Sequence, residues 1–228
     1  MEKYIKLFAI ICIVCLPITM LLMNLEIVTF DISFFKDKYE EYNIENVTGI
    51  SEENLMLITE KLLDYLKGKR ENIIIFTDVG GKIEQVFEER ELLHLKDVRE
   101  LFRKEHVTRN LTLLLSVVSL IYIFYKDKNR LKKILVITSS IQLFLVGMLY
   151  ILIYSDFYKY FTYFHKILFS NDLWLLNPET DILIQMYPLE FFSSITYRIF
   201  VLFLLEILGL LLIALLLPSR KRSKHIGV

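Results

Sequence analysis

Two of the four histidines, His94 and His165, each have a carboxylate close by in the sequence. Asp97 follows His94 by three residues, and Asp172 and Asp181 follow His165. A carboxylate that bonds to an imidazole can fix its tautomer and tune its pKa across neutrality. The two histidines are therefore candidates for general acid–base chemistry. The alternative is that both are hydrogen-bonding residues at a membrane surface.

The other histidines and both cysteines are weaker candidates. His106 stands at the start of an apolar run, where we expect an interfacial position, and His225 lies in a basic tail, where we expect it to be solvated. Cys12 and Cys15 fall inside the first apolar run, which denies a zinc site further ligands and exposure. We expect both cysteines to be small buried apolar residues.

Several classes of site can be set aside. The sequence has no His-Glu-x-x-His, no Gly-x-Ser-x-Gly and no Gly-rich phosphate loop. Asp156, Asp172, Asp181 and Glu190 could join the two histidines around a divalent metal, which leaves a metal-dependent membrane hydrolase open. Nothing in their spacing favours it, so we predict neither metal nor cofactor. The net charge is zero and no basic stripe with interleaved aromatics lies outside the membrane flanks, so nucleic acid is not an expected partner.

The chain is apolar and charged in separate segments. It is 54% hydrophobic with a mean hydropathy of +0.46, although 24% of its residues are charged. This composition predicts a mainly α integral membrane protein with four transmembrane helices and an extracellular α/β cap. The predicted segments are helix 1 (1–25), the cap (26–107), helix 2 (108–125), a cytoplasmic loop (126–130), helix 3 (131–154), an extracellular active-site loop (155–194), helix 4 (195–217) and a cytoplasmic tail (218–228). The first run lacks a small-x-small cleavage site, so we predict an uncleaved helix.

Basic residues set the predicted orientation. Lys and Arg gather in the short loop 126–133 and in the tail 219–224, and lysines precede the first span. By the positive-inside rule both termini and this loop are cytoplasmic, and the cap and the loop 155–194 are external. His94, near the end of the cap, and His165, just beyond the third span, then lie on the same face of the membrane at similar depth.

The cap is predicted to contain two helices and a hairpin. Ser51 is a typical N-cap, and the apolar spacing that follows predicts a helix that ends at Gly68. Residues 72–77 and 82–87 are predicted strands around a turn at 78–81. Residues 88–105 have helical spacing and continue into the second span.

The stretch 163–188 is too polar for lipid and too aromatic for an ordinary surface loop. Aromatic residues crowd both of its ends, as expected at a headgroup boundary. It contains the chain's one tryptophan and an Asn-Pro turn, so we predict a site there. The supporting or substrate-binding residues predicted beside the two histidines are Asp97, Tyr163, Phe164, Asn171, Asp172, Trp174, Asn177, Asp181 and Tyr187.

Two blocks resemble a known family. They are Leu93–Val98 (LHLKDV) and Phe164–Pro178 (FHKILFSNDLWLLNP), the second followed by Asp181 and by Tyr187 with a proline. Together with the order of spans, they are similar to the bacterial lipoprotein intramolecular transacylase (Lit) family. The resemblance covers nearly the whole chain, and residues 26–70 match in general character only.

The resemblance implies an acyltransferase of the bacterial cytoplasmic membrane. Such an enzyme moves the sn-2 acyl chain of a diacylglyceryl lipoprotein to the α-amino group of its N-terminal cysteine, which gives a lyso-form lipoprotein. Its partners are diacylated lipoproteins and membrane lipids, and the family's two catalytic histidines map onto His94 and His165. A non-catalytic lipoprotein- or lipid-binding membrane protein remains the alternative from another class.

Overall fold

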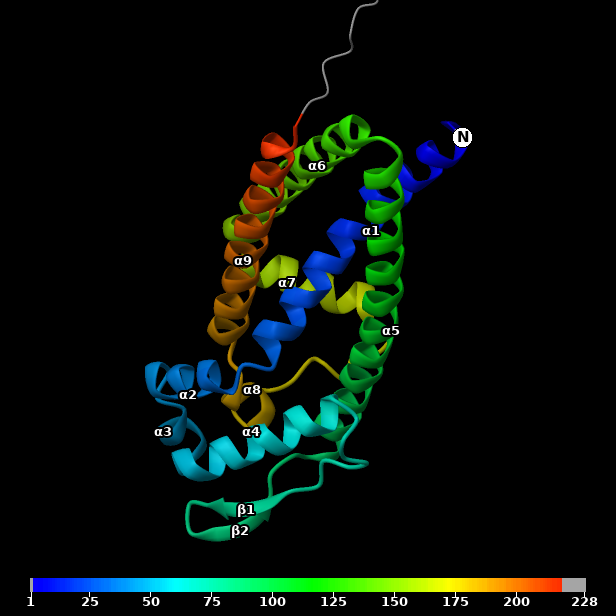
Figure 1. Ribbon diagram of the computed structural model, residues 1–228. Helices are drawn as coiled ribbons and strands as arrows, with labels where there is room; N and C mark the ends of the chain where they lie inside the picture. The colour runs from blue at the N-terminus through cyan, green and yellow to red at the C-terminus, as the bar shows by residue number, and fades with distance from the viewer. Residues whose placement is uncertain (1, 219–228) are drawn as a thin grey trace, which may run out of the picture. The chain divides into compact units, whose positions relative to one another are not determined.

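The computed structural model describes residues 2–218; the basic tail predicted beyond them, with His225, lies outside the described residues. Within this range the chain is mainly helical, with one small sheet (Figure 1). The elements in order are α1 (Glu2–Thr29), α2 (Ile32–Glu41), α3 (Ile44–Thr48), α4 (Glu52–Leu66), β1 (Phe76–Val79), β2 (Lys82–Gln85), α5 (Glu89–Lys126), α6 (Lys128–Ser155), α7 (Phe157–Leu168), α8 (Ile182–Met186) and α9 (Leu189–Leu216).

Four of the helices in residues 2–218 are long and apolar enough to cross a membrane: α1, α5, α6 and α9. The predicted fold class, a mainly helical membrane protein with four spans and a small sheet, is confirmed. Helix α5 is the longest, with 38 residues, and its first half is heavily charged. No 18-residue stretch of it with two or fewer charged residues begins before Glu105. His94 therefore lies outside the apolar part of the helix.

The chain forms two compact units. The membrane unit comprises Met1–Asn24, Thr108–Ile151 and Phe200–Val228, and the cap unit comprises Leu25–Val107 and Leu152–Ile199. Each of the four long helices contributes residues to both units. Each unit is described below by itself.

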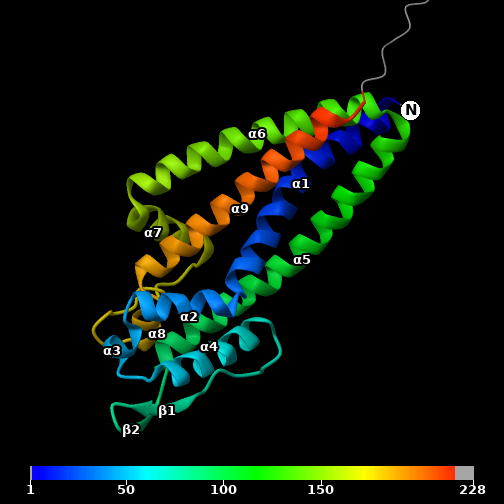
Figure 2. The same cartoon turned by 60° about the vertical axis from the view of Figure 1, so that its left-hand side comes forward.

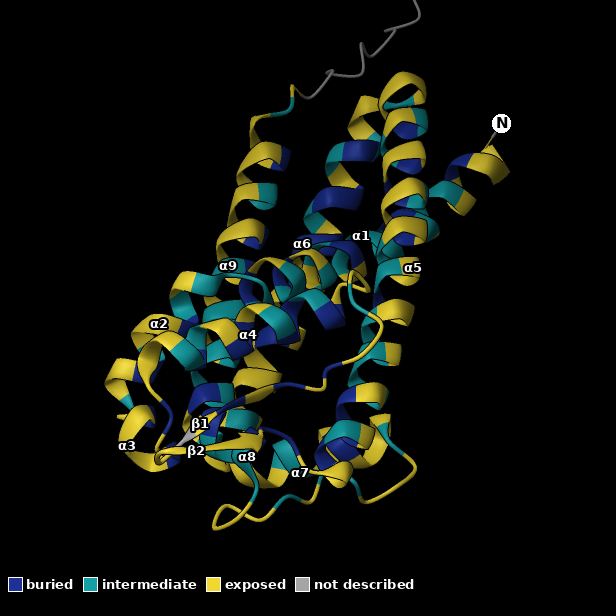
Figure 3. Cartoon of the chain, turned by 90° about the horizontal axis from the view of Figure 1, so that it is seen from below, coloured by how far each residue is buried: buried dark blue, intermediate teal, exposed yellow. Residues whose placement is uncertain are grey.

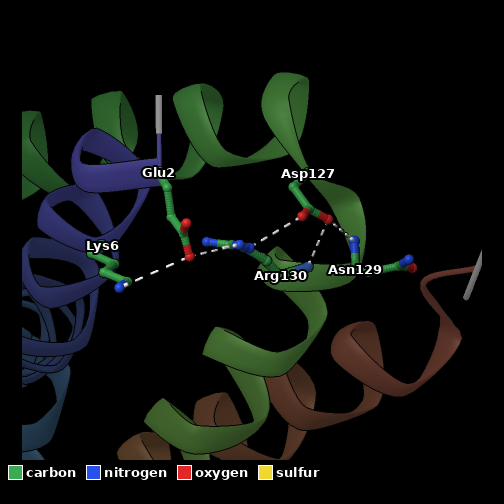
Figure 4. A network of polar contacts seen from close by, with 5 residues as sticks. All are labelled: Glu2, Lys6, Asp127, Asn129 and Arg130. Atoms are coloured by element: carbon green, nitrogen blue, oxygen red, sulfur yellow. Dashed lines mark hydrogen bonds and ion pairs between the residues drawn. The ribbon is translucent and has the colours of Figure 1, made fainter.

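Polar contacts gather at one end of the membrane unit. Asp127 alone joins α5 to α6, and one of its carboxylate oxygens accepts the backbone N–H groups of Asn129 and Arg130, both at 3.1 Å. The Arg130 guanidinium also contacts Glu2, and Figure 4 shows this network extending to Lys6. Because Lys132 donates to the carbonyl oxygens of Leu215 and Leu217, the end of α9 lies here too. The start of α1, the junction of α5 and α6, and the end of α9 therefore lie together at this end of the membrane unit.

Helix α4 supplies much of the cap unit's core. Ser51 Oγ accepts the backbone N–H of Asn54 at 3.4 Å, so the predicted N-cap is confirmed. The buried side chains of α4 recur at helical spacing and pack against α2, α8 and the start of α9. Figures 1 and 2 show α2, α3, α4 and α8 grouped together, and Figure 3 shows buried residues along one side of α4.

The hairpin was predicted with the wrong strand ends. Strand β1 begins at Phe76 and continues through Asp78 to the residue before Gly80, so the turn contains only Gly80 and Gly81. Both glycines have positive φ, at 59° and 90°, which a two-residue hairpin turn requires. Beyond the strand ends, the carbonyl oxygen of Ile75 still accepts the N–H of Val86 at 2.9 Å. The side chains of Ile73 and Ile75 are buried in the cap core.

Candidate active site

His94 and His165 come from different helices of the cap unit and lie next to each other. His94 is in the second turn of α5 and His165 in the last turn of α7. Their ring centres are 6.3 Å apart, and each residue is only 8% exposed. Phe169 packs against both rings, with its centre 5.3 Å from His94 and 5.8 Å from His165. The structure thus brings together the two histidines that the sequence isolated.

Aromatic side chains enclose His165. The indole of Trp174 stacks on its ring at 4.9 Å with an interplanar angle of 29°, and Phe161 contacts the ring edge-on at 4.4 Å. Phe164 approaches from another side at 5.4 Å. These rings leave the imidazole little contact with water, so proton transfer there is shielded from bulk solvent.

The tautomer of His165 follows from one hydrogen bond. Its Nδ1 lies 2.8 Å from the carbonyl oxygen of Phe161, one helical turn earlier. A carbonyl oxygen only accepts, so Nδ1 carries the proton and the neutral ring has its lone pair on Nε2. Burial lowers the pKa of His165, and this outweighs the bond to Phe161, which favours the charged form. At neutral pH the ring is a neutral base.

His94 is also neutral at neutral pH. Burial and the nearby His165 lower its pKa from 6.5 to about 4, although Asp97 acts in the opposite direction. Its Nδ1 is buried and has no hydrogen-bond partner among the described residues. The structure therefore holds two uncharged imidazoles side by side.

Two of the three aspartates expected beside the rings bind groups of the loop and do not orient an imidazole. Asp97 Oδ2 accepts the side-chain amide of Asn171 at 2.8 Å, and no bond joins it to His94 Nδ1. The Asp181 carboxylate accepts the backbone N–H of Asn177 at 2.8 Å and a threonine hydroxyl. A backbone carbonyl orients His165 in place of a carboxylate. The physical reason is that these aspartates satisfy donors of the loop, which lie closer to them.

Local bonds shape the loop that carries Trp174. Trp174 Nε1 donates to the carbonyl oxygen of Asn171 at 3.0 Å, and Asn171 Oδ1 accepts the N–H of Leu173 at 3.1 Å. Arg90, on α5, donates to the carbonyl oxygen of Asp172 at 2.6 Å. Together with the bond from Asn171 to Asp97, this ties the loop to the helix of His94 at two points.

Three further predicted residues also lie outside the immediate contacts of the histidine pair. Tyr163 is 47% exposed on α7 and packs against Tyr160. Asn177 Oδ1 accepts the backbone N–H of Glu179, within the loop. Tyr187 is 5% exposed in the cap core, and its hydroxyl lies 3.1 Å from that of Thr59.

Sequence reasoning missed Glu91. Its side chain is fully buried one turn before His94. One carboxylate oxygen accepts the N–H of Leu183 at the start of α8, and the other accepts the N–H of Glu88 before α5, both at 2.6 Å. Burial raises its pKa, against the effect of these two bonds. The contact with Glu88 is the carboxylate half of a capping box. It went unseen because the N-cap position holds Glu88 and not Ser or Thr.

Metal ligands do not gather at the site. Across residues 2–218, no group of three or more His, Cys, Asp or Glu side chains is placed to hold a metal ion.

Four candidate spans define a multi-pass helical membrane protein. A buried pair of neutral histidines lies beyond the apolar parts of these spans. The sequence profile described as "Lipoprotein intramolecular transacylase Lit" matches residues 10–192. The chain therefore belongs to this family of acyltransferases, which act on lipoproteins. The resemblance seen in the sequence is confirmed.

Solved structures give the same fold. The membrane integral lipoprotein intramolecular transacylase Lit from Bacillus cereus superimposes with a TM-score of 0.79 at 21% identity, over 94% of each chain. A variant of that protein with a histidine replaced by alanine, and one with a histidine replaced by arginine, each give a TM-score of 0.76 at 20% identity over 95% of this chain. They are covered over 94% and 92% of their own lengths. No curated protein matches the chain.

Proposed function

We propose that the protein moves the sn-2 acyl chain of a diacylglyceryl lipoprotein to the α-amino group of the N-terminal cysteine of the same molecule. The observation that carries this proposal is the pair of buried, neutral imidazoles 6.3 Å apart in a member of the Lit family. Nε2 of His165 has a free lone pair, because its Nδ1–H is donated to Phe161. His165 can therefore act as the general base.

The reaction conserves protons, which suits a neutral pair. The amine attacks the ester carbonyl and loses a proton, which His165 takes up through Nε2. His94 then donates a proton to the departing glyceryl oxygen and receives in its place the proton that His165 took up. The C–N bond forms, the C–O bond breaks, and no covalent acyl-enzyme is needed.

The aromatic side chains around the two histidines suit a substrate that must fold back on itself to react. The tetrahedral intermediate contains a ring of eight atoms, from the amine nitrogen through Cα, Cβ, sulfur, two glyceryl carbons and the ester oxygen to the carbonyl carbon. Medium rings close reluctantly, so holding the lipid head in a reactive conformation can contribute on the order of several kcal/mol. Phe161, Phe169 and Trp174 surround the imidazoles and can supply that confinement.

The proposed setting is the external face of the bacterial cytoplasmic membrane. Arg130 and Lys132 lie at the end of the membrane unit where α1 begins and α9 ends, with Lys126 and Lys128 beside them in the sequence. We propose that this end is cytoplasmic by the positive-inside rule. The cap unit, with both histidines, is then external, where the lipid-modified cysteine of a lipoprotein resides.

A test must allow for the substrate and product having the same mass. Purified protein in vesicles is incubated with a synthetic diacylated lipopeptide, and loss of the free α-amine is followed by amine labelling and fragmentation mass spectrometry. We expect His94→Ala, His94→Asn, His165→Ala and His165→Asn to lose at least a hundredfold in rate. His106→Ala, a histidine outside the pair, is the control and keeps its rate.

The outcomes separate the alternatives. Retained isomerisation in both His94→Ala and His165→Ala contradicts the assigned roles. Wild-type protein that binds the lipopeptide without isomerising it supports the non-catalytic binding protein. A released fatty acid that depends on added zinc supports the metal-dependent hydrolase.

A further inference from the structure

Helix α7 has an apolar face that is largely exposed. At about 100° per residue, Tyr160, Tyr163, Phe164 and Ile167 share one side of the helix. Ile167 is 81% exposed, Phe164 51% and Tyr163 47%. A contiguous exposed face of large apolar side chains marks a binding surface.

The polar residues of α7 lie on other sides of the helix. Lys159, Thr162 and Lys166 occupy a separate sector, at least 40° from the nearest residue of the apolar face by the same angle of about 100° per residue. His165 occupies a third sector and is 8% exposed, facing the ring of His94. Helix α7 therefore presents His165 to the protein and its apolar face outward. Lys159 and Lys166 lie between these two sides of the helix.

The position of α7 in the chain indicates what covers the apolar face. Helix α6, a candidate span, ends at Ser155, and α7 begins at Phe157. Asp156, the one residue between them, caps α7 by accepting the N–H of Lys159 at 3.0 Å. The chain thus enters α7 immediately on leaving a span. An amphipathic helix at that point, rich in Tyr and Phe and with Lys on its polar side, is suited to the plane of the membrane interface.

We propose that α7 lies in the plane of the membrane interface, with Tyr160, Tyr163, Phe164 and Ile167 among the acyl chains of the bilayer. This anchoring sets the depth of His165, so that its Nε2 meets the glyceryl ester of a substrate held in the same leaflet. The anchoring stands on the geometry of α7 alone, whereas the role in setting depth rests on the proposed function.

Trp174 makes the proposal measurable. It is the chain's one tryptophan and stacks on His165 at 4.9 Å, so its fluorescence reports the depth of the site. The full-length protein is reconstituted in phosphatidylcholine vesicles whose acyl chains carry bromines at defined positions. We expect Trp174 to be quenched most strongly by bromines near the ester groups. Absence of quenching at every bromine position overturns the anchoring and favours a second copy or another protein on this face.

Two matched variants separate anchoring from a general disturbance of α7. Ile167→Glu places a charge on the apolar face, and Thr162→Glu places the same charge on the polar side of the same helix. We expect Ile167→Glu to reduce quenching at least threefold, with an unchanged melting temperature, and Thr162→Glu to leave quenching near the wild-type value. Equal effects of the two variants overturn the anchoring.

The lipopeptide assay, run on the same vesicles, tests the role of depth. If Ile167→Glu loses quenching and its rate falls at least tenfold, the role of α7 in setting the depth of His165 is supported. If quenching is lost and the rate is unchanged, that role is overturned while the anchoring stands. If wild type shows strong quenching and no isomerisation, the proposed function fails and the anchoring is supported.

Discussion

Nδ1 of His165 lies 2.8 Å from the carbonyl oxygen of Phe161 within the same helix, and this bond decides where the ring can accept a proton. Because the acceptor belongs to the backbone, substitution of a neighbouring side chain cannot remove it. The tautomer is thus set by the helix itself, and Nε2 is left free beside His94. A base oriented this way does not depend on the charge state of a carboxylate.

The first prediction concerns the pH dependence of the rate. Burial lowers the pKa of both His165 and His94, the latter to about 4, so both rings are neutral above about pH 6.5. The substrate's α-amino group has an ordinary pKa of about 7.7–8.0 and reacts only when neutral. We therefore expect the rate to rise with pH up to about 8 and then level off. A rate that falls between about pH 6.5 and 8 would show that an imidazolium is required in the free enzyme.

The second prediction concerns stability in acid. The pKa of His94 falls from 6.5 to about 4 on folding, so the unfolded chain binds more protons between these values. The native state is favoured above pH 6.5, and this contribution is lost as the pH falls toward 4. The loss approaches roughly 3 kcal/mol at the largest. Thermal unfolding of wild type and His94→Phe from pH 8 to 4 measures it, and we expect a flatter curve for the variant.

The third prediction concerns Glu91, whose carboxylate joins the start of α8 to the start of α5 one turn before His94. Glu91→Ala leaves two buried N–H groups without acceptors and should cost about 2–4 kcal/mol. Glu91→Gln keeps one acceptor, so we expect it to recover about half of that stability. Glu88→Gln, a change at the exposed neighbour, is the control. Equal melting temperatures for Glu91→Ala and wild type would contradict the assigned role.

The parts of the fold that the sequence predicted are those with strong periodicity. Helix α4 has a polar N-cap at Ser51 and buried residues at helical spacing, and both features are local. The strand ends of the hairpin were misjudged because the residues before β1, which include Ile73 and Ile75, are apolar. They are apolar because they pack in the core. A strand and a buried extended segment have the same composition, so only the tertiary structure separates them.

The histidine pair was predictable from the order of spans, whereas its surroundings were not. His94 and His165 were isolated because the positive-inside rule predicts that the cap and the loop 155–194 lie on the same side of the membrane. The acceptor of His165 is a backbone carbonyl, which leaves no mark in the sequence. Asp97 was assigned to His94 from its spacing, but Asn171 satisfies it from 74 residues away. Contacts of this kind depend on how the loop folds.

The fourth prediction concerns the contact between Asn171 and Asp97. Asn171→Asp replaces the amide that donates to Asp97 at 2.8 Å with a second carboxylate. The repulsion between the two carboxylates should displace the loop that carries Trp174. We expect the rate to fall about tenfold with a small change in melting temperature, because the pair is exposed. Adding Asp97→Asn restores an amide–carboxylate pair in the reverse order and should recover most of the rate. No recovery in the double variant would mean that Asn171 acts by another route.

The fifth prediction concerns Glu105, which is 7% exposed and whose two carboxylate oxygens have no hydrogen-bond partner among the described residues. Nε2 of His106 lies 3.9 Å from a carboxylate oxygen of Glu105 but 3.2 Å from Glu26, to which it bonds. A buried carboxyl without partners costs more than an apolar side chain of similar size.

We therefore expect Glu105→Leu to stabilise the protein by about 1–2 kcal/mol, measured as a rise in melting temperature in detergent. Glu26→Leu removes the hydrogen-bonded partner of His106 and is the matched variant with the opposite expected sign. A lower melting temperature for Glu105→Leu would show that the carboxyl binds a group essential to folding. The histidine pair lies about three helical turns away along α5, so the transacylation rate should be unchanged in both variants.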